Sequence, residues 1–348
     1  MPAEWEPHEG TWLQWPHNGT LLVDGSEGTD YREQLAEIWI NMTKELHIGE
    51  NVHIIVDNED EKTYVEGKLH ETDVDFNKID FLVRRIDDVW IRDNGPIFVW
   101  DDQGHPIITD WNFNGWGGRM PHEFDKQASA YISEHTNIPR VVVPEIRLEG
   151  GGIEVDGRGS FMAAKTSIIN DNRNPGKSQT EIEAVITKYF GVTNFIWITG
   201  LYGDDPGGEM TDFHIDGAAR FTCSNTILYE ADPFGVSEPY MLETYNKHYN
   251  ELRNYRDIDG NPFRLIPVPL TKENVKGLDY QGSYLNYYIG NEVVIVPVYG
   301  DENDALGLKI IEGQFPDRRV TGIDVCALYP NGGMLHCVTQ QQPILKRR

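Results

Sequence analysis

Apolar residues recur at helical spacing in five segments of the chain, and a short β-branched run follows each segment. The first predicted helix covers residues 31–47 and buries one face, which carries Leu35, Ile38, Trp39, Met42 and Leu46. The third begins at the capping-box pair Ser178 and Glu181. The other three lie near 123–135, 241–252 and 304–314. The predicted strands are 52–56, 81–83, 141–143, 195–198, 263–268 and 320–325. The pattern predicts a repeated helix–strand module.

Two α/β architectures alternate helix and strand in this way. A ring of modules and a doubly wound sheet both fit the pattern, so periodicity alone does not choose between them. The polar candidates fall in the loops after successive strands, and loops gathered at one end would converge on one pocket. Proline and glycine are spread throughout without a linker or low-complexity tract, so we expect residues 1–348 to form a single domain.

The chain carries a formal net charge of −26, from 56 acidic and 30 basic residues. Such a field repels nucleic acid and anionic membrane and concentrates small cations. The same acid excess would also serve solubility or a saline habitat. The start of the chain has no basic region followed by an apolar run, and no segment approaches 18 apolar residues. We therefore expect a cytoplasmic protein with a cationic small-molecule partner and no membrane or nucleic-acid partner.

The three cysteines lack CxxC spacing, which disfavours a zinc site and a disulfide scaffold. Cys223 and Cys326 occur in strand-like runs and are expected in the core. Cys337 follows a Gly-Gly turn near the end of the sequence, where a lone thiol is either a buried inert residue or a nucleophile. A nucleophilic Cys337 would need a positive partner to lower the pKa of the thiol, and His214 is the candidate.

Acids and imidazole stand beside glycine in three further segments, around Asp93, Glu149 and His214. His214 and Asp216 are two residues apart, so both would face one side of an extended segment. Two carboxylates such as Asp93 and Asp216 suit a planar guanidinium, and Glu149 would then orient His214. His214 held by a neighbouring acid in a purely structural role is the alternative. No spaced ligand set predicts a metal.

These segments together resemble the agmatine deiminases of the guanidine-modifying superfamily, which also holds arginine deiminases, amidinotransferases and bacterial peptidyl-arginine deiminases. The resemblance covers nearly the whole chain. The matching segments are Glu4-Trp5-Glu6-Pro7-His8-Glu9, 12–16, 90–96, 112–118, 149–152, 172–175, 200–204 and His336-Cys337-Val338-Thr339-Gln340-Gln341. The resemblance implies a five-bladed α/β propeller with pseudo-fivefold symmetry, consistent with the modules above.

The resemblance also implies the residue roles. Cys337 is expected to be the nucleophile, His214 the general acid/base, Glu149 its partner, and Asp93 and Asp216 the guanidinium-binding pair. Trp90 is expected to line the substrate channel. The implied reaction converts agmatine and water to N-carbamoylputrescine and ammonia through a covalent thiouronium, without metal or cofactor. The oligomeric state is left open, a homodimer included.

One segment departs from the family pattern Asp-Thr-x-Gly-His-x-Asp. Met210 stands where the family has aspartate, and Phe213 where it has glycine. Either Glu209 or Asp212 would then have to bind the far ammonium of agmatine. If neither does, the substrate tail would meet an apolar surface. The open alternatives are a deiminase of arginine, a guanidino acid or peptidyl-arginine, an amidinotransferase, and a guanidine-binding protein without catalysis.

Overall fold

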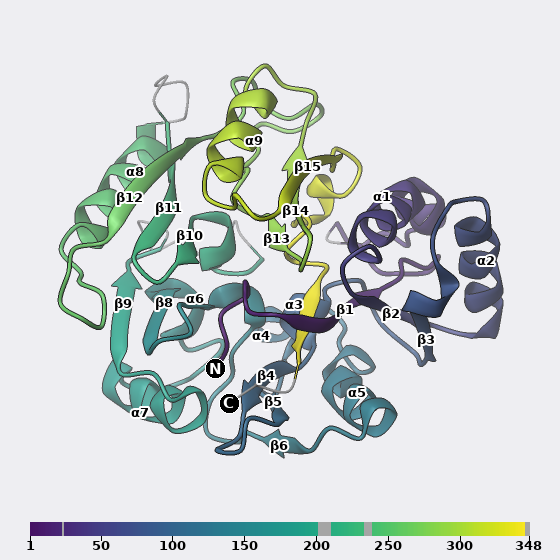
Figure 1. Ribbon diagram of the computed structural model, residues 1–348, viewed down its shortest axis with the longest axis horizontal. Coiled ribbons are helices and arrows are strands. Elements are labelled where there is room, and N and C mark those ends of the chain that lie inside the picture. The colour runs from purple at the N-terminus through teal and green to yellow at the C-terminus, as the bar shows by residue number, and fades with distance from the viewer. Residues whose placement is uncertain (23, 201–209, 233–238, 345–348) are drawn as a thin grey trace.

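The computed structural model describes residues 1–22, 24–200, 210–232 and 239–344, and its strands form five small sheets arranged in a ring (Figure 1). The first sheet holds β1 (His8–Gln14), β2 (Asn51–Val56), β3 (Ile79–Val83) and β16 (Gln340–Pro343). The next two hold β4 (Ile97–Trp100), β5 (Pro106–Asp110) and β6 (Arg140–Val142), then β7 (Glu154–Val155), β8 (Ser160–Ala164) and β9 (Asn194–Ile198). The last two hold β10 (Ala219–Cys223), β11 (Thr226–Ala231) and β12 (Arg264–Pro269), then β13 (Tyr288–Ile289), β14 (Val293–Val298) and β15 (Arg319–Asp324).

One strand topology repeats around the ring. In each three-stranded sheet the first strand pairs antiparallel with the second, and the second pairs parallel with the third. A parallel pair needs a crossover, which the long helices supply. The first sheet combines strands from the beginning and the end of the described chain. In it β16 pairs antiparallel with β1, and β1 pairs parallel with β2. This closure confirms the five-bladed α/β propeller and excludes the doubly wound alternative.

The crossover helices pack between neighbouring sheets. Helix α8 (Pro239–Leu252) contacts β9 and β11, and α9 (Asp304–Glu312) contacts β12 and β15. Helix α1 (Tyr31–Leu46) contacts β2 as well as β14 and β15. The remaining helices are α2 (Glu59–His70), α3 (Ile91–Asn94), α4 (Gly115–Gly118), α5 (Ala128–Thr136), α6 (Lys165–Ile168) and α7 (Gln179–Phe190). Each helix in the described part of the chain is too short or too polar to cross a bilayer.

The sequence pattern predicted most of these elements. The capping box is present, since the Ser178 side chain accepts from the Glu181 backbone while the Glu181 side chain accepts from Ser178. The second predicted helix was too long, because a short 3-10 turn at Asp125–Gln127 precedes α5. Helix α2 was missed, because it buries only Val65 and Leu69 and its apolar periodicity is weak.

The prediction that Cys223 and Cys326 lie in the core was wrong. Cys223 ends β10, where a register shift after Phe221 turns the side chain outward, and it is exposed. Cys326 follows the end of β15 and is half-buried. Neither thiol lies in the buried core.

Candidate active site

The predicted site residues occupy equivalent places in the repeat, in the segments that precede the first strand of each sheet. Asp93 lies in α3 before β4, and Glu149 precedes the 3-10 turn Gly150–Gly152 and β7. His214 and Asp216 lie at the 3-10 turn Ile215–Gly217 before β10, and Cys337 lies in the turn before β16. The His214–Asp216 segment is thus a turn, and not the extended segment expected from the sequence. The closed ring gathers all of these segments.

The fifth module contributes a residue that the sequence analysis missed. Asn286 lies before β13, at the place in the repeat where the other modules carry their site residues. Its Nδ2 donates to the Cys337 Sγ at 3.2 Å. An asparagine in a Tyr-rich loop carries no motif of its own. The repeat could have found it, because every other module places a polar side chain just before its first strand.

His214 lies between two carboxylates. Its Nε2 is 2.7 Å from Oε2 of Glu149, and its Nδ1 is 3.7 Å from Oδ2 of Asp93. Burial works against a charged imidazole, but Asp93 and Glu149 outweigh it and raise the pKa of His214 to about 9. The imidazolium is therefore the main form at neutral pH.

A buried arginine, Arg173, also holds Glu149. Arg173 Nε donates to Oε1 of Glu149 at 2.5 Å, and its Nη1 donates to Oδ2 of Asp212 at 2.7 Å. Burial favours the neutral acid, yet the charges of Arg173 and His214 hold the pKa of Glu149 below its usual range. Arg173 belongs to a segment that carried the resemblance, but its role as the link between Glu149 and Asp212 was not predicted.

Asp93 is fixed by two neutral donors. Trp116 Nε1 donates to its Oδ2 at 2.8 Å, and the backbone N–H of Gly151 donates to its Oδ1 at 3.0 Å. Trp116 adopts a left-handed backbone at φ 52°, which turns its ring toward Asp93. Burial raises the pKa of Asp93, and the charge of His214 offsets only part of this effect. A bound cation would favour the ionised form.

Gly151 shows that the triple glycine is more than a plain turn. A Cβ on Gly151 would stand 2.7 Å from Nδ1 of His214, 2.8 Å from Oδ1 of Asp93 and 3.0 Å from Oδ2 of Asp216. Any side chain here would push these three groups apart. The backbone therefore has to be glycine for the acids and the imidazole to converge.

Asp216 lies beside the nucleophile candidate. The Cys337 Sγ is 3.7 Å from Oδ2 of Asp216, and the residue is half-buried while the acids around it are buried. Burial, together with Asp216 and Asp93, raises the pKa of the Cys337 thiol well above its usual range. The thiol is therefore neutral in this arrangement, and a cation bound beside Asp93 and Asp216 would favour the thiolate.

Trp90 packs next to the cysteine turn. Its ring passes so close to Gly333 that a Cβ there would lie 2.5 Å from the Trp90 ring and 3.1 Å from the Cys337 Sγ. The Trp90 Nε1 donates to Oδ2 of Asp88 at 2.8 Å. Asp88 thus anchors the tryptophan, and burial raises the pKa of Asp88 to about 6.

The two residues predicted to bind the substrate tail have different outcomes. Glu209 lies outside the described residues. Asp212 has no exposed surface, and its oxygens are held by Arg119 at 2.8 Å and by Arg173 at 2.7 Å. Asp212 is therefore not available to a substrate ammonium in this arrangement, which corrects the expectation. Its carboxylate instead fixes Arg173.

The backbone at Asp212 and Phe213 is strained. Asp212 and Phe213 have φ values of 57° and 75°, a left-handed region that bulky residues seldom enter. Each such residue costs about 1–3 kcal/mol and persists only where the surroundings enforce it. The pairing of Asp212 with Arg119 and Arg173 supplies that constraint. His214 directly follows Phe213, so the strained backbone positions the imidazole.

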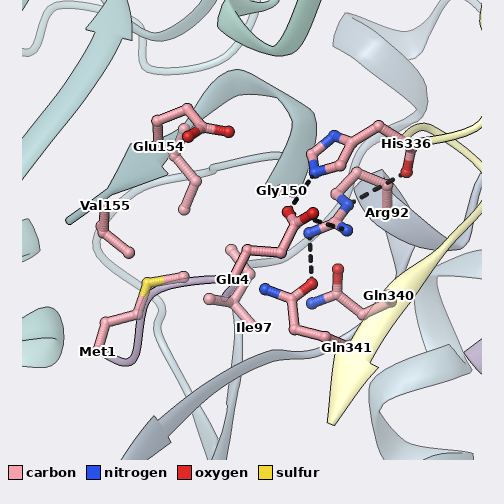
Figure 2. Close-up of a pocket in the computed structure, with 11 residues that line it drawn as sticks. Met1, Glu4, Arg92, Ile97, Gly150, Glu154, Val155, His336, Gln340 and Gln341 are labelled. Atoms are coloured by element: carbon pink, nitrogen blue, oxygen red, sulfur yellow. Dashed lines mark hydrogen bonds and ion pairs between the residues drawn. The ribbon is translucent and has the colours of Figure 1, made fainter. Parts of the chain in front are cut away.

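A small cavity lies behind the site, near the N-terminal segment. It measures about 20 Å³, roughly the space of one water molecule. Figure 2 shows that Arg92, Gly150 and His336 line it, and these are chain neighbours of Asp93, Glu149 and Cys337. The loops that carry the site residues thus present one face to the site and the other to this cavity, where Glu4 is inserted.

Within the described ranges, Glu4, Glu154 and His336 form the group whose ligand atoms lie close enough to hold a metal ion, within 4.8 Å of one another. Arg220 is already bonded to Glu154 and also lies 3.1 Å from Oε2 of Glu4. A guanidinium in this place supplies the positive charge that a metal would bring, so the group fits a cation poorly.

Comparison with known proteins identifies the family to which this chain belongs. Residues 1–343 match the Porphyromonas-type peptidyl-arginine deiminase family, so the chain belongs to this family. It is 32% identical over 368 residues to the agmatine deiminase of Pseudomonas aeruginosa, covering 99% of this chain and 95% of that protein.

Solved structures of relatives share the whole fold. The agmatine deiminase of Enterococcus faecalis superposes with a TM-score of 0.86 at 27% identity, covering 99% of this chain and 96% of that one. A cysteine-to-serine variant of C. jejuni agmatine deiminase with substrate bound gives a TM-score of 0.83 at 25% identity, covering 100% and 96%.

Proposed function

We propose that this protein is an agmatine deiminase, a hydrolase that converts agmatine and water to N-carbamoylputrescine and ammonia. The single observation that carries the proposal is the convergence of Cys337, His214, Asp93 and Asp216 around one buried position, with Glu149 behind the imidazole. Relatives with this activity in their names, in Pseudomonas aeruginosa and Enterococcus faecalis, support the choice of agmatine.

Substrate binding uses the two aspartates. A guanidinium is planar and offers paired N–H donors, which the carboxylates of Asp93 and Asp216 accept from two sides. The cation also offsets the charges that keep the Cys337 thiol neutral, since Asp216 and Asp93 both raise its pKa. Binding of the substrate therefore favours release of the thiol proton to solvent, and the resulting thiolate attacks the substrate.

The reaction then proceeds in two stages. The Cys337 sulfur attacks the guanidinium carbon, and His214 gives a proton to the departing ammonia through Nδ1, the nitrogen that Glu149 leaves to the pocket. This forms a covalent thiouronium. His214 next takes one proton from water, whose oxygen adds to the same carbon. The C–S bond then breaks, and the remaining hydroxyl proton passes to the departing thiolate, which releases the ureido product and restores the thiol.

A second candidate is a deiminase of another guanidino compound. Met210 and Phe213 replace the aspartate and glycine that we expect before the histidine, and Met210 packs against the apolar cluster that contains Trp90 and Trp116. An apolar lining on the tail side would favour guanidines with uncharged tails.

A guanidine panel tests the assignment. Ammonia release is measured with agmatine, arginine, a peptidyl-arginine and a neutral alkylguanidine, and we expect agmatine to give the highest kcat/KM. Prior treatment with a chelator should change nothing, as expected for an enzyme without metal. Binding of agmatine without ammonia release would contradict the proposal, and so would activity that is lost on chelation and restored by metal.

We also propose that residues 1–348 act as one domain, because the site draws side chains from positions 90 to 337 and the first sheet pairs β1 with β16. The cytoplasmic location and a homodimer stay predictions. Analytical ultracentrifugation would test the homodimer.

A further inference from the structure

Three segments that are distant in sequence meet behind the nucleophile. Glu4 comes from the segment before β1, Asp216 from the turn before β10 and His336 from the turn that carries Cys337. The three side chains are 8%, 2% and 1% exposed. Figure 2 shows Glu4 inserted between the imidazole of His336 and the guanidinium of Arg92. The other oxygen of Glu4, Oε1, accepts from the backbone N–H of Ile289 in β13 at 2.8 Å.

Both ring nitrogens of His336 face carboxylates. Nδ1 is 2.8 Å from Oδ2 of Asp216, and Nε2 is 2.7 Å from Oε2 of Glu4. Ionised carboxylates only accept hydrogen bonds, and a neutral imidazole has a single N–H to donate. If His336 were neutral and both acids were ionised, one ring nitrogen would direct its lone pair at a carboxylate oxygen, which is a repulsive contact. Both contacts are hydrogen bonds when each ring nitrogen of His336 carries a proton.

The other charged groups around this triad favour the same proton distribution. Arg220 lies 3.1 Å from Glu4, and the nearer Arg92 nitrogen lies 3.7 Å from it, so Glu4 stays ionised beside two guanidinium groups. Burial favours the neutral form of Glu4, whereas Arg220 and Arg92 lower the pKa of Glu4 whatever the charge of His336. Glu154 is the remaining acid near His336, and Arg220 neutralises it.

Asp216 faces His336 on one side and the site on the other. The oxygen that accepts from His336 is the one 3.7 Å from the Cys337 sulfur. Burial would favour a protonated Asp216, yet the hydrogen bond from His336 holds the pKa of Asp216 below its usual range. Asp93 and His214 are the other titratable groups near Asp216 on the site side.

We propose that Glu4 and His336 are positioning residues: Glu4 keeps His336 doubly protonated, and His336 holds Asp216 ionised and aimed at the guanidinium. The second half of this inference rests on the proposed function, whereas the protonation of His336 does not. The N-terminal segment, which contains no catalytic residue, is thus a working part of the site.

The first test reads the protonation of His336 directly. In protein labelled with 15N-histidine, the two ring nitrogens of His336 should show the similar, donor-type chemical shifts of an imidazolium from pH 6 to pH 8, with the signals assigned by their loss in His336→Gln. A neutral tautomer of His336 in the wild-type protein would overturn the proposal, whatever the protein does with agmatine.

The second test removes the charge of Glu4. In Glu4→Gln the side chain keeps its shape, but the charge that keeps the second proton on the ring is lost. We expect the alkaline limb of kcat/KM for agmatine to move down by about one pH unit or more, with a rise in KM. Glu50→Gln is the matched control, since Glu50 is equally buried and lies 3.3 Å from His8.

The outcomes separate the hypotheses. A shifted limb in Glu4→Gln and an unchanged limb in Glu50→Gln support the positioning role. Equal changes in both variants, or lower activity with no movement of the limb in Glu4→Gln, would reduce Glu4 to a structural residue. Absence of deimination in the wild-type protein would instead reject the proposed function and leave the nitrogen shifts of His336 to decide the first half.

Discussion

Oε2 of Glu149 lies 2.7 Å from Nε2 of His214, so Nδ1 is the nitrogen that faces Asp93 and the reacting atoms. This one contact fixes the ring orientation and adds a charge that raises the pKa of His214 to about 9. The same Glu149 is bound by Arg173, which in turn binds Asp212. The orientation of the acid/base candidate thus depends on a chain of buried charges behind it.

Removal of this contact should change the pH dependence. In Glu149→Gln the imidazole loses a charged partner, so it should lose its proton at lower pH and the alkaline limb of kcat/KM should move down from about pH 9. The raised pKa means that the His214 contribution to the free energy of unfolding is complete below about pH 6.5 and is lost as pH rises through about 9. Glu183→Gln, whose carboxylate accepts from Trp197, is the control and should leave the limb in place.

Replacement of the nucleophile should abolish turnover. Cys337→Ala removes only the attacking sulfur, so ammonia release should fall to background while circular dichroism and the melting temperature stay near those of the wild-type protein. Cys223→Ala changes an exposed side chain and should lie within about 0.5 kcal/mol of wild-type stability, with full activity. Ammonia release retained by the Cys337 variant would rule out this nucleophile.

The two guanidinium-binding acids should each be needed. Asp93→Asn and Asp216→Asn leave one side of the substrate charge without its partner, and a hydrogen bond to a charged group is worth about 1.5–3 kcal/mol. We expect kcat/KM for agmatine to fall by roughly 10- to 150-fold in each variant. Steady-state kinetics measure this loss, and a change below about threefold in either variant would remove that acid from the binding pair.

Asp212 should matter for stability. Asp212→Asn leaves the buried Arg173 with one acid in place of two, and loss of a partner from a buried ion pair costs about 3–5 kcal/mol. Asp259 also pairs with an arginine, Arg158, at 2.8 Å, but both side chains are about half-exposed. Asp259→Asn should therefore cost less than about 1 kcal/mol. Equal losses of unfolding free energy in Asp212→Asn and Asp259→Asn, measured by urea unfolding, would contradict the role of Asp212 as a buried partner of Arg173.

Substrate selection should reveal what binds the tail. If Glu209 supplies the acid that Met210 does not, agmatine should exceed arginine in kcat/KM, because an acidic surface repels the arginine carboxylate. Glu209→Gln should then raise KM for agmatine with little change in kcat. Met210→Asp restores the family residue and should raise activity on agmatine relative to an alkylguanidine. A preference of the wild-type protein for the alkylguanidine would favour an apolar tail site.

The sequence by itself determined the α/β modules and the identity of five candidate residues. Apolar periodicity located α1, α7, α8 and α9, because apolar residues recur at helical spacing along each of them. The charged helix α2 was not predicted, since its apolar periodicity is weak and only Val65 and Leu69 are buried. Cys337, Asp93 and His214 stood out because glycine and turn residues beside reactive side chains are a local signal.

Only the tertiary structure decided how the residues outside these motifs act. Pairing of β1 with β16 closes the ring and brings Glu4 within hydrogen-bond distance of His336, although 332 positions separate them. Asn286, Trp116 and Arg173 likewise acquire their roles from contacts that no local pattern encodes. Local sequence specifies which backbone turns form, whereas the proton and charge of a buried group depend on neighbours that only the folded ring supplies.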